Sequence, residues 1–398
     1  MIMQDNEKKP ALRFKGFTDP WEQRKLGEVF EEYSEKNHAE LPPLTIIQGG
    51  GTIRRDESER ALQYDKSSLS NYKMVNKDDF IVHLRSFEGG LEKASSQGII
   101  SPAYHTFHGE DVDSRFYYAY FRSKNFINKD LKPHVYGIRD GRSIDIEGMK
   151  TIRIPWASYP EQKSIGDFLT HLDILITLHQ RKYEKLVNIK KSMLDKMFPQ
   201  NGASVPEIRF KGFTDPWEQR KVGTLIEDYT EKTVTQNQYP VLTSSQQQGI
   251  VLQEDYFADR QVTTDNNVGY YVLPKGYFTY RSRSDTDVFV FNRNNIVDKG
   301  IISYYYPVFA PKSCDSNFLL RRLNHGIKKQ LSMAAEGTGQ KVLAHAKFKN
   351  MVVDVPSQSE QEKIGTILEE LDTLITLHQR KLEKLQNIKK SCLEKMFV

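Results

Sequence analysis

The feature that most constrains this chain is an internal repeat. Residues 13–25 read RFKGFTDPWEQRK, and residues 209–221 read the same thirteen letters. The string LITLHQRK stands at residues 175–182 and again at residues 374–381. Ordered matches at a nearly constant spacing of about 200 residues do not arise by chance, so the chain consists of two homologous units. The polar residues 200–205 are the expected linker between them.

Between these matching flanks the two halves have diverged, and only scattered identical residues remain at matching positions. Ordinary drift after a duplication explains the divergence, but it does not explain why the flanks alone were spared. One structural frame that carries two different recognition surfaces would produce this pattern. We therefore expect two variable regions that keep one fold and differ in what they recognise.

Composition limits the class of protein. The 398 residues are 38% hydrophobic and 27% charged, which is typical of a soluble globular protein. No apolar run approaches the roughly 20 residues of a membrane helix, and the first residues lack the apolar core of a signal peptide. The two cysteines, Cys314 and Cys392, are too few for a disulfide framework, so we expect a cytoplasmic protein. A net charge of +5 permits nucleic-acid binding without requiring it.

A long helix is predicted at the end of each half. Residues 161–198 carry apolar side chains at helical spacing over more than four heptads with no internal proline, which predicts a coiled-coil helix. The basic residues near the end of each helix suit the negative end of the helix dipole, and they could equally face phosphates or an acidic partner. The predicted seam consists of Ile165, Leu172, His179, Leu186 and Met193, and of Ile364, Leu371, His378, Leu385 and Cys392.

The seam histidines and the other histidines do not predict a metal site. His179 and His378 could bind a metal, but no third ligand stands at suitable spacing, and a polar seam residue more often fixes helix register. His105 and His108 form a pair that also lacks a third ligand. We expect no metal bound by this chain.

The repeated segment near the start of each half is predicted to begin a helix. Asp19 can cap, Pro20 suits the first helical position, and Glu22 can reach back to the cap. Thirteen unchanged letters exceed what capping requires, so we expect this segment to bind the same kind of partner subunit twice. The aromatic residues expected to make that contact are Phe14, Phe17, Trp21, Phe210, Phe213 and Trp217.

Catalytic signatures are not found in the sequence. There is no GxxxxGK[ST] phosphate loop, and the glycines at residues 337–339 form a lone GxG without a following strand and helix. No pair of cysteine and histidine recurs in both halves. We therefore expect a chain that is not an enzyme by itself and that binds no cofactor.

Polar and basic loops recur at matching positions of the two variable regions. Glycine allows close backbone approach, and glutamine and arginine can bind adenine and guanine through paired hydrogen bonds in the major groove. Each such residue alone would fit a solvated loop equally well, but the repeated set favours DNA reading. The candidates are Gln48, Arg54, Arg55, Arg85, Ser86, Tyr136, Arg139 and Arg142 in the first half, and Ser245, Gln246, Gln247, Gln248, Arg281, Arg283, Thr338, Gln340 and Lys341 in the second.

Two pairs of segments carry a resemblance to a known family. TDPWEQRKLGE and TDPWEQRKVGT resemble the starts of two target-recognition domains, and EQKSIGDFLTHLDILITLHQRK and EQEKIGTILEELDTLITLHQRK resemble two conserved spacer helices. Over essentially its whole length the chain resembles the specificity subunit of a type I restriction-modification enzyme. The resemblance implies a non-catalytic subunit that recognises a split double-stranded DNA sequence and binds two modification subunits, which restriction subunits join. It also implies that S-adenosylmethionine, ATP and Mg²⁺ are bound by those partners.

The expected architecture is α+β, with two homologous mixed recognition domains and two long helices. The expected division is into recognition domains at residues 11–160 and 206–358 and spacer helices at residues 161–199 and 359–398. One long helix per repeated unit favours a pseudo-two-fold arrangement of antiparallel helices, whose length would set the gap between two half-sites. Because the variable regions differ, we expect an asymmetric target. The alternatives are a coiled-coil scaffold with two heads that bind protein or glycan, and a standalone nuclease or methyltransferase.

Overall fold

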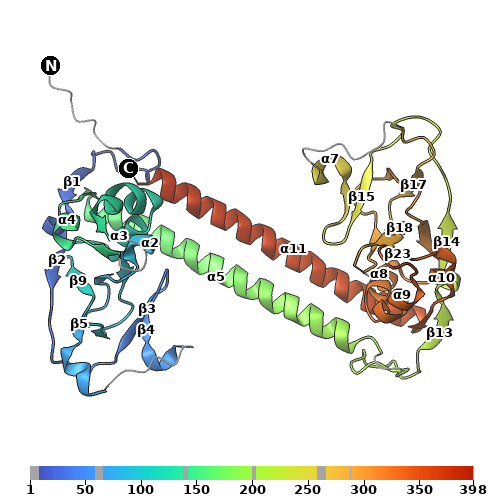
Figure 1. Ribbon diagram of the computed structural model, residues 1–398, viewed down its shortest axis with the longest axis horizontal. Coiled ribbons are helices and arrows are strands. Elements are labelled where there is room, and N and C mark those ends of the chain that lie inside the picture. The colour runs from blue at the N-terminus through green and yellow to red at the C-terminus, as the bar shows by residue number, and fades with distance from the viewer. Residues whose placement is uncertain are drawn as a thin grey trace. The chain divides into compact units, whose positions relative to one another are not determined.

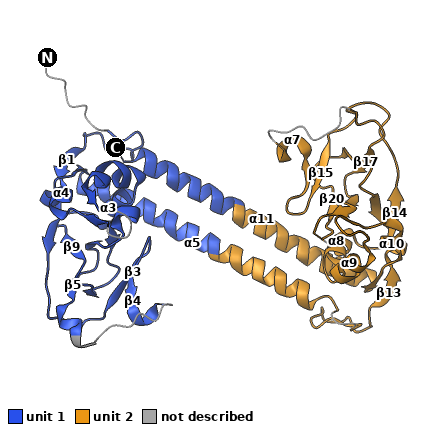
Figure 2. Cartoon of the chain, in the orientation of Figure 1, with its two compact units in different colours: residues 1–180, 380–398 blue, residues 181–379 orange. Residues whose placement is uncertain are grey.

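The chain forms two compact units, which Figure 2 distinguishes by colour. Unit 1 comprises residues 1–180 and 380–398, and unit 2 comprises residues 181–379. Each unit contains a head of strands and short helices and a part of each of the two long helices (Figure 1). The fold is therefore α+β, as expected. This computed structural model describes residues 9–58, 66–137, 142–199, 203–257, 266–286 and 288–397.

The head of unit 1 is built around a four-stranded antiparallel sheet in the order β2-β9-β6-β7. The head also contains four two-stranded ladders, β1-β12, β3-β4, β5-β8 and β10-β11. The strands are β1 (Glu22–Lys25), β2 (Glu31–Tyr33), β3 (Leu44–Ile47), β4 (Gly51–Arg54), β5 (Lys73–Val75), β6 (Phe80–Val82), β7 (Glu92–Lys93), β8 (Gly98–Ile100), β9 (His105–His108), β10 (Val135–Tyr136), β11 (Ser143–Ile144) and β12 (Arg153–Trp156). The α-helices are α1 (Leu26–Val29), α2 (Ser86–Gly89), α3 (Ser114–Phe121), α4 (Ile146–Lys150) and α5 (Tyr159–Lys196).

The head of unit 2 repeats this plan around a sheet in the order β14-β22-β18-β20. Its smaller ladders are β13-β24, β15-β16, β17-β21 and β19-β23. The strands are β13 (Glu218–Lys221), β14 (Ile226–Tyr229), β15 (Leu242–Ser245), β16 (Gly249–Leu252), β17 (Tyr271–Pro274), β18 (Phe278–Tyr280), β19 (Arg283–Ser284), β20 (Phe291–Arg293), β21 (Lys299–Ile302), β22 (Val308–Pro311), β23 (Lys341–Val342) and β24 (Val352–Val355). The helices are α6 (Val222–Leu225), α7 (Gln253–Tyr256), α8 (Ser316–Asn324), α9 (Lys328–Ala334), α10 (His345–Asn350) and α11 (Gln358–Lys395).

Strand register shows that the two heads share one frame. In unit 1 Phe80 pairs with Phe107, and in unit 2 Phe278 pairs with Phe309. All four rings are buried, and they form the centre of each sheet. The frame was thus kept while the sequence between the flanks changed. The heads differ at one ladder, because β10 pairs with β11 in unit 1 whereas β19 pairs with β23 in unit 2.

Both predicted long helices are present. α5 and α11 begin at Tyr159 and Gln358 and are 38 residues long. In unit 1 the first part of α5 lies antiparallel to the last part of α11, and Lys389 Nζ donates to Asp173 Oδ1 at 2.5 Å. In unit 2 Lys190 pairs with Asp372 in the same way.

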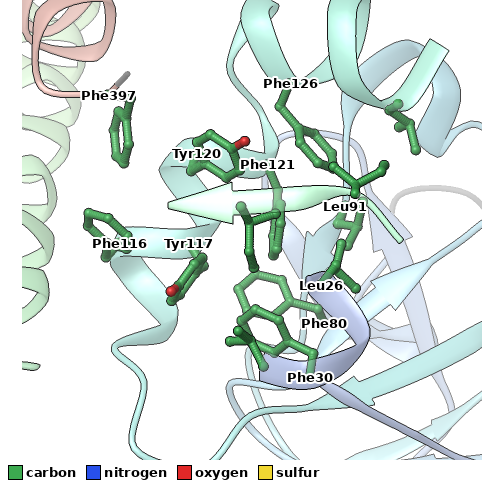
Figure 3. Packing of buried hydrophobic residues seen from close by; sticks show 14 of the residues in the cluster. Leu26, Phe30, Phe80, Leu91, Phe116, Tyr117, Tyr120, Phe121, Phe126 and Phe397 are labelled. Atoms are coloured by element: carbon green, nitrogen blue, oxygen red, sulfur yellow. The ribbon is translucent and has the colours of Figure 1, made fainter. Parts of the chain in front are cut away.

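Each head is completed by the end of the long helix that starts in the other unit. Phe397, just after α11, lies in the core of unit 1, where its ring centroid is 5.1 Å from that of Phe116 (Figure 3). Phe198, just after α5, lies in the core of unit 2 at 5.8 Å from Phe318. Cys392 is buried in the same core as Phe397, so it fills an apolar position.

The repeated segment near each start does not form the predicted helix. Residues Glu22–Lys25 form β1, which pairs with β12, and Glu218–Lys221 form β13, which pairs with β24. The Asp-Pro step favours a helix start only locally, and hydrogen bonding to a distant strand overrides that preference. Among the described residues, no helix combines the length and the apolar character that crossing a membrane requires.

Candidate nucleic-acid interface

The hairpin formed by β3 and β4 presents Gln48 at its tip. Residues 48–50 form the turn, Gln48 is exposed, and Gly49 and Gly51 adopt φ values of +85° and +74°. Side chains rarely adopt these angles, so the glycines are required for the shape of the turn. The Gln48 side chain packs on α2, because a Cβ on Gly89 would lie 2.3 Å from Gln48 Nε2. The hairpin tip and α2 therefore form one surface.

Helix α2 and the ladder β10-β11 bring further candidates to this surface. Arg85 is exposed at the start of α2. The guanidinium of Arg142 lies 5.5 Å from the ring centroid of Phe87, within α2, and Tyr136 is 58% exposed on β10. The structure thus brings Gln48, Arg85 and Arg142 to one side of the unit 1 head. Arg139 lies outside the described residues.

Arg54 and Arg55 lie at the other end of the same hairpin. Arg54 pairs across the ladder with Leu44, whereas the turn is at Ile47 and Gly51. Arg55 donates to Leu44 O at 3.3 Å and to Tyr72 Oη at 3.3 Å, so it holds the hairpin base to its surroundings. These two arginines therefore lie at the base of the hairpin, away from Gln48 at its tip.

The equivalent hairpin of unit 2, β15-β16, presents three glutamines. Ser245 pairs with Gly249 as Ile47 pairs with Gly51, so the two turns have the same length. Gln246, Gln247 and Gln248 are exposed at the tip. The Gln246 side chain donates to Val288 O at 3.4 Å, which connects the hairpin to the segment that follows β19.

The ladder β19-β23 brings four predicted residues of unit 2 together. Arg283 pairs with Val342 and Ser284 pairs with Lys341. Gln340 Nε2 donates to Asp285 Oδ1 at 3.0 Å, and Arg281 lies 3.9 Å from the other oxygen of that carboxylate.

Two further side chains complete this part of the surface. The guanidinium of Arg283 lies 4.7 Å from the ring centroid of Tyr305, which is 47% exposed. Thr338 is exposed in the loop before β23. Exposed arginine, glutamine and tyrosine side chains of this kind can hydrogen bond to bases and phosphates.

Two predicted serines are buried and hold turns. Ser86 is 0% exposed and its Oγ accepts a hydrogen bond from His83 N at 2.9 Å. Ser245 is 5% exposed and its Oγ accepts from Gln247 N and Gln248 N, both at 3.2 Å. Both hydroxyls accept hydrogen bonds within their own turns, so these serines shape the loops that carry the exposed side chains. Sequence reasoning does not detect this difference because burial depends on the tertiary fold.

The predicted partner-binding aromatic residues pack within their own units. Trp21 is 5% exposed, and its Nε1 donates to Glu161 Oε2 at 3.0 Å. Trp217 is 3% exposed in the core of unit 2. Phe14 stacks edge-on against Phe168 of α5 at 5.7 Å. Phe210 packs against the core of unit 2, and Phe213 lies 4.8 Å from Lys363 Nζ.

The same segment fixes the start of each long helix by an ion pair. Arg13 donates to both carboxylate oxygens of Glu161 at 2.7 and 2.6 Å, and Arg209 does the same to Glu360 at 2.8 and 2.6 Å. These contacts give the thirteen repeated residues a structural role that does not need a partner. Whether the remaining exposed residues of this segment also contact a partner stays a prediction.

Other charged groups are neutralised inside the heads. Lys150 lies 2.6 Å and His105 2.7 Å from the carboxylate of Glu32, and Lys349 and His345 lie 2.7 and 2.9 Å from that of Asp228. Burial alone would raise the pKa of Glu32, but its hydrogen bonds to Lys150 and His105 outweigh burial and lower the pKa below its usual value. These clusters belong to the shared frame and not to the variable surface.

The predicted seam of the long helices is largely buried. Ile165, Leu172, Ile364, Leu371 and Cys392 are all below 10% exposed. His179 and His378 are half-buried, and no group of three or more potential metal ligands is found among the residues that the structure describes. Leu186, Met193 and Leu385 are half-buried and pack against the cores of the units.

A family model identifies the chain. The model, which describes the type I restriction modification DNA specificity domain, matches residues 18–188 and 215–387. These two ranges are corresponding parts of the two halves, and together they span most of the sequence. The chain belongs to this family.

Individual proteins and solved structures are also similar to this chain. The type I restriction enzyme MjaVIII specificity subunit of Methanocaldococcus jannaschii is 22% identical over 353 residues, which cover 80% of this chain and 77% of the relative. The crystal structure of a type I restriction-modification S subunit from M. genitalium matches with a TM-score of 0.57 at 13% identity, covering 98% of this chain and 99% of that one. The HsdS subunit of Thermoanaerobacter tengcongensis matches at 16% identity and a TM-score of 0.43, covering 95% and 96%.

Membership makes this chain a specificity subunit, which is a non-catalytic component of a restriction-modification system. Sequence reasoning missed one surface of this subunit. Ile174, Leu175 and Leu178 of α5 are 51%, 43% and 50% exposed, and Leu374 and Leu377 of α11 are 42% and 43% exposed. Both leucine pairs belong to the repeated string LITLHQRK. The available signal was that these apolar residues stand outside the predicted seam.

Proposed function

We propose that this specificity subunit reads an asymmetric DNA target in two parts, one with each head, and directs modification and restriction subunits to it. The pair of equivalent hairpins carries the proposal. The tips occupy the same place in the same frame, but one reads Gln-Gly-Gly at residues 48–50 and the other Gln-Gln-Gln at residues 246–248. A frame that keeps its strand order and register and varies its exposed amides is suited to two different base sequences.

The chemistry of the two surfaces supports DNA as the ligand. Gln48, Arg85 and Arg142 in unit 1 have side chains that can bind base edges or phosphates, as do Gln247, Arg283 and Gln340 in unit 2. Contacts to phosphates would supply most of the affinity and make it depend on salt. The exposed amides and guanidinium groups would supply the choice of sequence.

The exposed leucines of the two long helices support the docking of partner subunits. Leu175 and Leu178 on α5 correspond to Leu374 and Leu377 on α11, so two copies of one partner could bind equivalent faces. Leu374 also lines a hollow of about 410 Å³ in unit 2. Apolar side chains repeated on one helix face mark an interaction surface. On this proposal the partners are two modification subunits, which bind S-adenosylmethionine, and restriction subunits, which use ATP and Mg²⁺.

The long helices would set the distance between the two halves of the target. Helices of 38 residues span about 57 Å. We take residues 11–160 and 206–358 as the recognition domains and residues 161–199 and 359–398 as the spacers. On this division the gap between half-sites follows from helix length, as it follows from dimer spacing in symmetric repressors.

Mapping of methylated bases in host DNA tests the proposal. We expect a cell that carries this gene with its modification partner to methylate one motif with two defined halves separated by a gap of fixed length. Deletion of the gene should abolish methylation at that motif. A continuous or symmetric motif, or methylation that persists in the deletion strain, would contradict the proposal.

A DNA mobility assay separates this function from that of a protein- or glycan-binding scaffold. The subunit assembled with its modification partner should retard a duplex that carries the mapped motif more strongly than a duplex with one half scrambled. Equal retardation of both duplexes would favour the scaffold.

A further inference from the structure

A buried carboxylate lies directly beneath the hairpin tip of unit 1. Glu92, on β7, is 0% exposed. Its Oε1 accepts a hydrogen bond from Gly49 N at 2.6 Å, and its Oε2 accepts one from Gly51 N at 3.1 Å. Both donors belong to the turn that presents Gln48. One side chain of the central sheet therefore fixes the backbone on both sides of the tip.

Two side chains of α3 and its end support that carboxylate. Arg122 donates to Glu92 Oε1, and Tyr118 Oη donates to Glu92 Oε2 at 2.8 Å. A buried carboxylate is stable only when it is paired and its remaining lone pairs are satisfied. Burial also raises the pKa of the Tyr118 hydroxyl, which therefore remains a donor. Glu92 thus has four donors, two of which come from the turn.

The residue at the same place in unit 2 anchors the other hairpin with opposite polarity. Glu92 pairs with Ile81 across its ladder, and Asn292 pairs with Thr279 at the equivalent position. Asn292 is 8% exposed, and its Nδ2 donates to Ser245 O and to Ser244 Oγ, both at 2.8 Å. Glu92 accepts hydrogen bonds from backbone N–H groups of its hairpin, whereas Asn292 donates to a backbone carbonyl of its own hairpin. Each side chain therefore matches the backbone groups that face it.

The supporting residues change together with the anchor. The helix α8 carries Leu320 and Asn324 where α3 and its end carry Tyr118 and Arg122. Asn324 binds the backbone of Phe291 instead of the anchor, and Leu320 packs against the core. A neutral amide needs no cation, so the loss of Arg122 fits the exchange of Glu92 for Asn292.

We infer that Glu92 and Asn292 are positioning residues, each of which fixes the tip of its own hairpin and thereby the base choice of one half of the target. This inference rests on the proposed function and adds to it the residues that fix the conformation of each hairpin tip. A tip fixed before binding loses less conformational entropy when its glutamines meet the bases. A tip without its anchor would adopt several shapes and accept several sequences. Neither anchor has to touch DNA.

The test uses the subunit assembled with its modification partner and duplexes that carry the mapped motif. Discrimination is the ratio of affinities for the intact motif and for a motif with one half scrambled, measured separately for each half. Glu92→Gln keeps the shape but turns an amide N–H toward one of the turn's N–H groups. The unsatisfied buried donor destabilises the fixed shape of the turn. We therefore expect discrimination of the half of the target read by unit 1, the first half, to fall roughly 5- to 100-fold. Discrimination of the second half should stay unchanged.

Asn292→Asp is the reciprocal variant in unit 2. A carboxylate at this position faces the carbonyl oxygen of Ser245 and has lost the donor that bound it. We expect the second half to lose discrimination and the first half to keep it. Amide hydrogen exchange supplies an independent readout: exchange at residues 47–51 should accelerate in Glu92→Gln, and exchange at residues 245–249 should accelerate in Asn292→Asp.

A milder variant and a matched control keep the test decisive. Tyr118→Phe removes one of the four donors to Glu92, so it should give a smaller loss on the first half even if Glu92→Gln does not fold. Asp79, 2% exposed in the same head, accepts hydrogen bonds from Tyr33 Oη, His108 and Asn76 N, which all lie outside the hairpin. Asp79→Asn should destabilise the head without changing the discrimination of either half.

Three outcomes would overturn this inference alone. Unchanged discrimination and exchange in both Glu92→Gln and Tyr118→Phe would show that the anchor does not position the tip. Equal losses on both halves, or a loss in Asp79→Asn as large as that in Glu92→Gln, would show general destabilisation. In each of these cases the wild type still discriminates and the proposed function stands. A wild-type complex that prefers no sequence would remove the proposed function and this inference together.

Discussion

At the scale of single residues, the same side chains do the same work in both units. Arg13 donates two hydrogen bonds to Glu161, and Arg209 donates two to Glu360, in each case at the start of a long helix. The two carboxylates are each 1% exposed. A buried carboxylate that loses its cation keeps its desolvation cost without compensation. This explains why these letters were conserved between two halves that otherwise diverged.

Arg209→Ala should therefore destabilise the chain. We expect a loss of about 3–5 kcal/mol in the free energy of unfolding, because Glu360 would remain buried and unpaired. Urea unfolding followed by tryptophan fluorescence measures it. The control is Glu207→Ala, which removes the exposed pair with Lys196 and should cost at most about 1 kcal/mol. If both variants lost the same stability, the ion pair at the helix start would stabilise the chain no more than an exposed surface pair does.

The sequence indicates which polar side chains are exposed at the hairpin tips better than it indicates which are buried. Gln48 and Gln247 were identifiable because glutamine and glycine clustered at matching positions of both halves. Ser245 looked identical to them in the sequence, yet its hydroxyl is buried beneath the turn. Glu92 and Asn292 gave no motif at all, since a single polar residue in a short strand is uninformative until its neighbours are known. Only contacts between distant segments distinguish these roles.

At the scale of elements, the long periodic segments were predicted correctly, whereas the short segment repeated near the start of each half was not. Two long helices were expected because many apolar positions repeat with one period, and the structure has them at Tyr159–Lys196 and Gln358–Lys395. The segment Glu22–Lys25 was expected in a helix and forms β1 instead, because its partner β12 lies more than a hundred residues away. Local capping signals cannot report such a partner.

The exposed leucines of the long helices give a prediction at this scale. Leu178→Glu and Leu377→Glu should each weaken association with the modification subunit by at least about tenfold, because an apolar contact would be replaced by a charge. Co-purification and analytical ultracentrifugation measure it. The melting temperature should not fall, since the two leucines are 50% and 43% exposed.

Thr177→Glu and Thr376→Glu are the matched controls for that experiment. Both threonines are exposed neighbours of these leucines on the same helices, and they add the same charge without removing an apolar side chain. Association should remain close to that of the wild type. If the threonine variants weakened association as strongly as the leucine variants, added charge and not the loss of apolar contact would be the cause.

At the scale of the whole molecule, each head should be exchangeable as a block. Residues 26–153 begin directly after β1 and end where β12 begins, so an exchange leaves most of the β1-β12 ladder in place. We expect a chimaera with this block from another member of the family to methylate a motif with one new half and one old half. Base-modification mapping of host DNA would reveal it. A motif in which both halves changed would disprove the assignment of one reader to each head.

The exchange of helix ends has a consequence for ancestry. Met197 and Phe198 complete the core of unit 2, and Met396 and Phe397 complete that of unit 1, with the same letters in both places. A chain of half this length would therefore contain both an incomplete head core and the helix end that completes such a core. Two copies of it could complete each other's cores. Such a pair would be symmetric and, if each head reads one half of a DNA target as proposed, it would read only palindromic targets. Fusion into one gene removes that restriction, because each copy can then mutate without changing the other.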